Sequence, residues 1–218
     1  MLESVRFAQD IYPQFVDALG VTLSLAAVSL PTAFVLGVVL AFARLHGLRA
    51  VRVVLAAFVD FLRNTPLLLQ MFVLYFGLPL LGWRLSGFSC ATIAIAVQHG
   101  AYLSEIIRGG VESVSRNQWE AARAIGMSDA LALRDVIVPQ ALVRVTAPIG
   151  NQFIVLVKDT SVASAIGVLE LTLNGKVIIE RTAASFEVFL VIASLYLAMS
   201  ALLGGAVRLA ERRVQGRM

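Results

Sequence analysis

Five charged residues lie inside or beside stretches that are otherwise apolar, and their types could bind a small charged molecule. They are Asp60, Arg63, Glu105, Lys158 and Asp159. A charge at the centre of a bilayer costs roughly 2.5–3.5 kcal/mol, so such residues usually face a protein interior or a water-filled cavity. A carboxylate could pair with an ammonium group, and a lysine with a carboxylate. Two interpretations follow: a path for a charged solute, or ion pairs that only hold helices together.

The apolar stretches around these charges have membrane length. Of the 218 residues, 59% are hydrophobic and 15% charged, with a mean hydropathy of +0.84. Ordinary soluble domains are nearer half apolar and a quarter charged. Each run is close to the ~20 residues that a spanning helix needs. We predict an all-α membrane protein in which residues 1–218 form one transmembrane domain with five spans, at about 19–43, 53–79, 86–108, 146–169 and 187–208.

The basic residues divide unevenly between the two sides of these spans. Twelve lie in the connections 44–52 and 108–144 and in the C-terminal tail, and four lie in the N-terminal segment and the other connections. The positive-inside rule puts the twelve in the cytoplasm, so the N-terminus is outside and the C-terminus inside. The basic pI therefore requires no nucleic acid as a partner. Segment 1–17 lacks the apolar core of a signal peptide, and a short interfacial helix and a polar tail both fit it.

The second run is interrupted by Asn64, Thr65 and Pro66. Thr65 is predicted to cap a new helix and Pro66 to take its first position. Two half-helices would then meet near the middle of the bilayer, where a partly positive helix start suits a carboxylate. The alternative is a proline kink filled by a neighbouring helix.

The connection at about 112–144 is too polar to span a membrane and has the pattern of two helices joined by a turn. Asn117 and Glu120 have the spacing of a variant capping box, and Gly126 suits a helix end. Ser128 can cap a second helix that runs toward Pro139. A generic interpretation is an amphipathic surface helix, and a sharper one is a docking element for a soluble partner.

This connection resembles the EAA loop of bacterial ABC-importer permeases, through Glu120-Ala121-Ala122, Gly126 and the VIVP at 136–139. The stretches at 61–79, 101–114 and 150–171 resemble the polar amino-acid uptake permeases, which import histidine, arginine, glutamine, glutamate and opines. The resemblance covers about residues 15–210 and implies a type I ABC importer permease fold. Departures occur at Asn64 and Asn117, where the family often has Gly, and at His99, where it often has Asn.

The resemblance also implies roles for particular residues. Glu120, Ala121, Ala122 and Gly126 would form the site that couples the chain to an ATPase. The residues expected to line the substrate path are Asn64, Thr65, Glu105, Lys158, Asp159 and Thr160. Asp159 or Glu105 could take the substrate ammonium, and Lys158 or the helix start after Thr65 its carboxylate. A place near the cytoplasmic end of its span is the alternative for Glu105.

The partners implied by the resemblance are a cytoplasmic ABC ATPase dimer, a second identical or homologous permease subunit and a periplasmic amino-acid-binding protein, in the lipid of a bacterial inner membrane. The chain has no phosphate-binding loop and no hydrolase or zinc-protease motif. We therefore expect no enzyme activity, catalytic residue, metal ligand or cofactor in this chain, with ATP and magnesium bound by the partner ATPase.

The predicted function is the permease subunit of an ATP-driven importer of polar amino acids, basic ones included, or of related opines. The alternative is a free-standing secondary carrier or channel, which would have no need of an EAA docking element. A third class is a membrane scaffold that only recruits a soluble partner, against which the mid-span charges stand.

Overall fold

The structure, a computed structural model, describes residues 2–216, with side chains from Tyr12 onward, and its regular elements in that range are helices. The α-helices are α1 (Leu2–His46), α2 (Arg49–Asn64), α3 (Leu67–Phe72), α4 (Gly87–Glu112), α5 (Arg116–Ala124), α6 (Asp129–Ala132), α7 (Val138–Asp159), α8 (Leu171–Thr182) and α9 (Ser185–Gln215). Short π-helical and 3-10 segments extend α3, α6 and α7: η1 (Val73–Gly77), η2 (Leu78–Leu81), η3 (Leu133–Ile137) and η4 (Thr160–Ile166).

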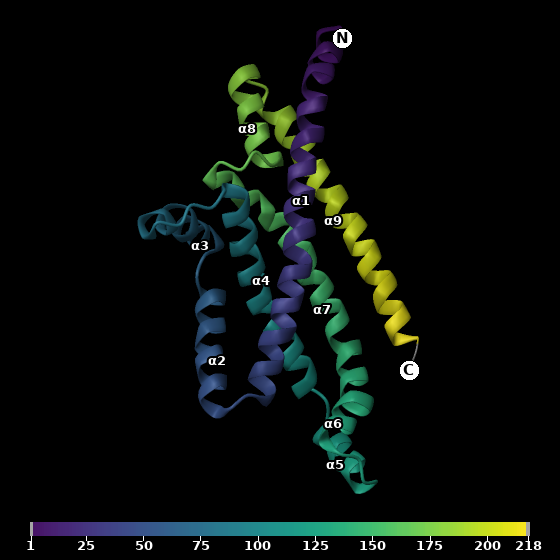
Figure 1. Cartoon of the computed structure of the whole chain (residues 1–218). Helices are drawn as coiled ribbons and strands as arrows, with labels where there is room; N and C mark the ends of the chain where they lie inside the picture. The colour runs from purple at the N-terminus through teal and green to yellow at the C-terminus, as the bar shows by residue number, and fades with distance from the viewer. Residues whose placement is uncertain (1, 217–218) are drawn as a thin grey trace.

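The long helices run side by side and form a bundle (Figure 1). α1 packs most extensively against α4, α7 packs against α4, and α9 packs against α7. The helices α5 and α6 lie at one end of the bundle, and α8 lies at the other end, near the N-terminus. α3 leaves the bundle sideways, so the chain between α2 and α4 makes a detour at the α8 end (Figure 1).

Within residues 2–216, four helices are long and apolar enough to cross a membrane. They are α1 from Tyr12 onward, α4, the continuous helix from Asp129 to Ile166, and α9. α2 and the segment 67–81 give a fifth crossing only as a pair, and this pair is bent by 104°. All five predicted runs are therefore helical, but the second contains a sharp break.

Two boundaries differ from the sequence analysis. Residues 2–17 form neither a separate interfacial helix nor a polar tail, because α1 continues from Leu2 through His46; residue 1 of the predicted segment lies outside the described residues. The helix capped by Ser128 does not end near Pro139 but continues into the fourth run. Pro139 stands in the first turn of α7, directly after the π-helical η3, where a missing N–H is tolerated.

A close approach between α1 and α4 fixes the centre of the bundle. A Cβ placed on Gly37 would lie 2.6 Å from the Cβ of Leu103 and 3.2 Å from the carbonyl oxygen of Gly100. Neither neighbour can move without moving the backbone of α4. Gly20 lies on the same helix, and a Cβ there meets nothing within 4 Å.

These two glycines give a matched test of the bundle contact. We expect Gly37→Ala to lower the free energy of unfolding by about 1–3 kcal/mol, because the added methyl group overpacks the contact. Gly20→Ala removes the same backbone freedom without a clash, so its stability should stay within about 1 kcal/mol of the parent. Thermal unfolding of both variants in detergent measures the difference. Equal midpoints for the two would show that the contact accommodates the added methyl group at Gly37 without loss of stability.

Candidate functional site

The break between α2 and α3 is built by Asn64, Thr65 and Pro66. Asn64 Nδ2 donates to the carbonyl oxygen of Asp60 at 2.7 Å, and Thr65 Oγ1 donates to that of Phe61 at 2.9 Å. The prediction that Thr65 caps the following helix is therefore wrong. A residue before proline is held extended, so the Thr65 hydroxyl closes the helix behind it. Pro66 is the N-cap of α3 and not its first residue as predicted, and it provides no side-chain cap.

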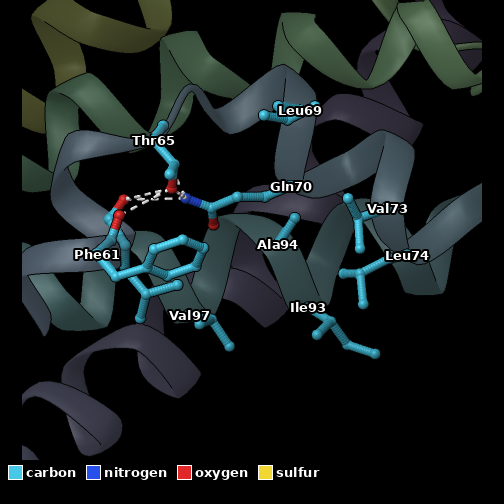
Figure 2. A pocket seen from close by; sticks show the side chains of 10 residues that line it. Phe61, Thr65, Leu69, Gln70, Val73, Leu74, Ile93, Ala94 and Val97 are labelled. Carbon is cyan, nitrogen blue, oxygen red and sulfur yellow. Dashed lines mark hydrogen bonds between the residues drawn. The ribbon is translucent and has the colours of Figure 1, made fainter. Parts of the chain in front are cut away.

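Two glutamines that the sequence analysis missed bind the end of α2. Gln98 of α4 donates through Nε2 to the carbonyl oxygens of Thr65 at 2.9 Å and of Leu62 at 3.3 Å. Gln70 donates to the Leu62 carbonyl and to Thr65 Oγ1, both at 2.9 Å (Figure 2). Orphan carbonyls at a helix end need donors when water is excluded. In the sequence, a polar amide side chain inside an uncharged, membrane-length run was the feature that could have identified both glutamines.

A cavity of about 240 Å³ lies beside this break, between α2, α3 and α4 (Figure 2). Phe61, Leu69 and Ile93 are among its lining residues, and Thr65 and Gln70 supply the polar groups at one side. Both polar side chains are already bound to the end of α2. None of the residues that line this cavity carries a charged side chain.

The second polar cluster joins α4 to the end of α7. His99 is 1% exposed, and its Nε2 lies 3.1 Å from Asp159 Oδ2. Its Nδ1 lies 2.8 Å from Gln152 Nε2. The Asp159 side chain is 36% exposed, and Lys158 beside it is exposed with no ion pair to any side chain of residues 12–216. Thr160 is buried and donates to the Val157 carbonyl oxygen at 2.7 Å.

Glu105 occupies a different environment, among arginines. It forms an ion pair with Arg44 of α1, its Oε2 lies 2.7 Å from Arg108 Nη2, and its Oε1 lies 4.0 Å from Arg63 Nη1. The Arg63 guanidinium also stands 5.5 Å from the centre of the Tyr102 ring. Both carboxylate oxygens of Glu105 therefore have cationic partners, and the cluster joins α1, α2 and α4.

The structure thus divides the predicted path residues into three groups. Asn64 and Thr65 lie at the break after α2, Asp159 lies with His99, and Glu105 lies with the arginines, about 9 Å further along α4 than His99 at 1.5 Å per residue. Consecutive residues of α4, Gln98 and His99, connect the first two groups. A pairing of His99 with Asp159 joins positions 60 residues apart, which spacing alone does not predict.

The predicted coupling segment is α5 and the turn after it. Its N-cap is Ser115, whose Oγ accepts from the Asn117 N–H at 3.3 Å, so the prediction of Asn117 as the cap is wrong. Glu120 pairs with Arg116 at 3.1 Å in the first turns of this helix. Asn117 lies inside the helix because the serine before Arg116 already supplies the acceptor oxygen.

Gly126 ends this segment as predicted. Its φ is +85°, which only glycine adopts readily. The N–H of Gly126 bonds to the Arg123 carbonyl at 2.9 Å, and the N–H of Met127 bonds to the Ala122 carbonyl at 3.1 Å. These two bonds form a Schellman motif. Ala122 is buried, whereas Glu120, Ala121 and Gly126 are exposed on the end of the bundle.

The helix α8 at the opposite end was not predicted. Glu170 caps it, accepting from the backbone N–H of Thr172 at 2.9 Å and of Leu173 at 3.0 Å, and from the Tyr196 hydroxyl at 2.8 Å. Glu170 is fully buried, and this burial raises the pKa of its carboxyl group while the hydrogen bonds oppose the rise. The side chain fixes α8 against α9 and leaves no oxygen for a ligand.

Comparison with known proteins identifies relatives over nearly the whole chain. Residues 33–216 match the family described as binding-protein-dependent transport system inner membrane component. The probable glutamine ABC transporter permease protein GlnM of Bacillus subtilis (strain 168) is 37% identical over 212 residues, which cover 97% of this chain and 98% of that protein. The nopaline transport system permease protein NocM of Agrobacterium fabrum (strain C58 / ATCC 33970) is 39% identical over 217 residues, covering 95% and 90%.

Among solved structures, the chain is similar to a crystal structure of an amino acid ABC transporter with histidines. The TM-score is 0.89 at 33% sequence identity, and the match covers 97% of both chains.

Proposed function

Since this chain belongs to the family of inner membrane components of binding-protein-dependent transport systems, and is the permease subunit of an ABC amino-acid importer, we propose that it crosses the membrane five times. The broken pair α2 and α3 is the second crossing. The α5 end and the C-terminus face the cytoplasm and the N-terminus faces the periplasm of a bacterial cell. The distribution of arginines supports this orientation.

We propose that α5 and its turn dock into a groove of a partner ATPase, with Glu120, Ala121, Ala122 and Gly126 as the coupling site. Two of the four, Glu120 and Ala121, present exposed side chains at the end of the bundle, and the buried Ala122 holds the helix against the rest of the chain. ATP and magnesium bind to that partner, an ATPase dimer. A second permease subunit, identical or homologous, and a periplasmic amino-acid-binding protein complete the transporter.

We propose that the substrate path runs past Asn64, Thr65, Lys158, Asp159 and Thr160, with the Asp159 carboxylate receiving the substrate ammonium. The partial exposure of Asp159, and His99 as its one side-chain partner among residues 12–216, support this assignment. Asp159 is a better candidate than Glu105, because arginines occupy both Glu105 oxygens. Lys158, exposed and adjacent, would receive the substrate carboxylate.

The substrate we propose is a polar amino acid, basic ones included, or a related opine. GlnM is named for glutamine and NocM for nopaline, and an α-amino acid carries the ammonium and carboxylate that Asp159 and Lys158 match. Both relatives are named as permeases of transport systems, so they give no support to a free-standing carrier or to a scaffold.

The coupling site is tested by purification of the tagged chain from its native membrane in mild detergent, with mass spectrometry of what co-purifies. We expect an ATPase with the parent and its loss with Glu120→Arg and with Gly126→Asp. Glu180→Arg is the matched control, because Glu180 is also exposed on a short helix but at the opposite end of the bundle. A parent chain that purifies intact without an ATPase in several detergents would refute the coupling assignment.

A further inference from the structure

The contacts of His99 fit one neutral tautomer of its ring. An amide nitrogen only donates hydrogen bonds, so Gln152 Nε2, 2.8 Å away, requires a lone pair on His99 Nδ1. The ring proton must then lie on Nε2, where it is donated to Asp159 Oδ2 at 3.1 Å. His99 is neutral in this arrangement, and it holds one oxygen of Asp159 while the other has no hydrogen-bond or ion-pair partner among residues 12–216.

The same cluster has a second arrangement at little structural cost. If the Gln152 amide turns over, its oxygen faces Nδ1, and a ring with protons on both nitrogens is satisfied equally well. His99 would then carry a positive charge directly against Asp159. The ring is 1% exposed. In this state the carboxylate of Asp159 therefore pairs with a buried charge of the protein and not with the ammonium group of a substrate.

No other carboxylate among the described residues competes for His99. α1 has no titratable residue between Asp17 and Arg44. On α2, Arg63 stands over Tyr102, whose ring is 6.4 Å from that of His99.

The polar and charged groups on α4 and α7 near His99 already have other partners or are cations. On α4, Gln98 binds the end of α2 and Glu105 binds arginines, and on α7 the neighbour of Asp159 is Lys158. In η4, Thr160 donates to its own helix.

We propose that His99 is a specificity-determining positioning residue, which holds Asp159 as an acceptor for a substrate ammonium when neutral and occupies Asp159 with its own charge when protonated. This inference rests on the proposed place of Asp159 in the substrate path. It assigns the site to substrates that bring a positive group, and it makes their uptake depend on the charge of His99. The pair of Gln152 and His99 is the element that switches.

The transport test compares uptake at pH 8 and pH 5.5 in cells that express the chain with its partners, with radiolabelled L-arginine, L-glutamine and L-glutamate as probes. In the parent we expect uptake of the transported amino acids to fall roughly tenfold at the lower pH, the factor expected when one charge-assisted hydrogen bond is lost. In His99→Asn, whose amide can still donate to Asp159 but cannot ionise, we expect the ratio of the two uptakes to stay within about twofold of one.

The matched control is His46→Asn, because His46 is the other histidine of the chain and lies at the end of α1. It should keep the pH response of the parent. An unchanged response in His99→Asn, or a response lost equally in His46→Asn, would overturn the proposal. Asp159→Asn separates a failure of the proposed substrate path from a failure of the inference about His99. Parent-like uptake in that variant would refute the substrate path, whatever the result for His99.

A second measurement decides the inference even where none of the three amino acids is carried. With only two histidines, the His46→Asn variant labelled with ¹⁵N-histidine reports on His99 alone. We expect the nitrogen shifts of the Nε2–H tautomer at pH 8. An Nδ1–H tautomer in the parent would contradict the arrangement from which the proposal starts.

Discussion

Replacement of Asp159 by Asn is expected to lower uptake at least tenfold while the transporter remains assembled. The amide keeps the shape of the carboxylate and can still accept from His99, but it has no charge to offer to an ammonium. Hydrogen bonds to a charged group contribute about 1.5–3 kcal/mol, which corresponds to roughly ten- to a hundredfold in affinity. Initial uptake rates, measured with gel filtration of the purified complex, separate a transport defect from a folding defect.

A control for this variant removes the same charge elsewhere. Glu187 is exposed in the first turn of α9, outside the clusters described above. Glu187→Gln should transport like the parent. If Asp159→Asn and Glu187→Gln had the same kinetics, Asp159 would have no place in the substrate path, and its contact with His99 would serve only to hold α4 against α7.

Replacement of Glu105 by Gln is expected to have the largest effect on stability. The variant leaves Arg44, whose side chain is 9% exposed, without its counter-charge, and it removes one of the two carboxylate partners of Arg108, which keeps Glu112. Breaking a buried ion pair at one member costs about 3–5 kcal/mol, and the partial exposure of this cluster places the expected loss near the lower end. Thermal unfolding in detergent, with the parent and variant under the same salt, measures it.

Two further variants define the source of this loss. Asp60→Asn removes a carboxylate that is 62% exposed and lies 3.9 Å from Arg63, so its effect should stay below about 1 kcal/mol. Glu105→Gln combined with Arg44→Leu removes both members of the pair and should recover part of the loss, because no buried charge is left alone. A double variant as unstable as the sum of its two single changes would mean that the pair is not coupled.

The sequence predicted the helices well because uncharged runs have a direct physical meaning in a membrane. Each of the five runs forms helix, and the Asn-Thr-Pro stretch marked the break at the correct residues. Gly126 was correctly assigned to a helix end, since a positive φ strongly favours glycine. These features depend on residues that are neighbours in the chain.

The features that were missed depend on contacts between distant residues. A run of apolar residues predicts the length of a helix but not the direction of its axis, so the bend of 104° after α2 could not be predicted. The pairing of His99 with Asp159 and the capture of Glu105 by Arg44 join segments that only the packing of α1, α4 and α7 brings together. Ser115 replaced Asn117 as a cap because two good capping residues lay two positions apart, and local preference does not choose between them.

The adjacent positions of Gln98 and His99 have a mechanical consequence for the whole chain. Neighbouring residues point about 100° apart around a helix axis, so one side chain of α4 binds the end of α2 and the next binds the end of α7. A rotation of α4 about its axis would pull on both of these ends together, in two different directions. The break after α2 and the end of α7 are therefore both tied to α4, and neither can shift alone unless its hydrogen bond to α4 is first broken.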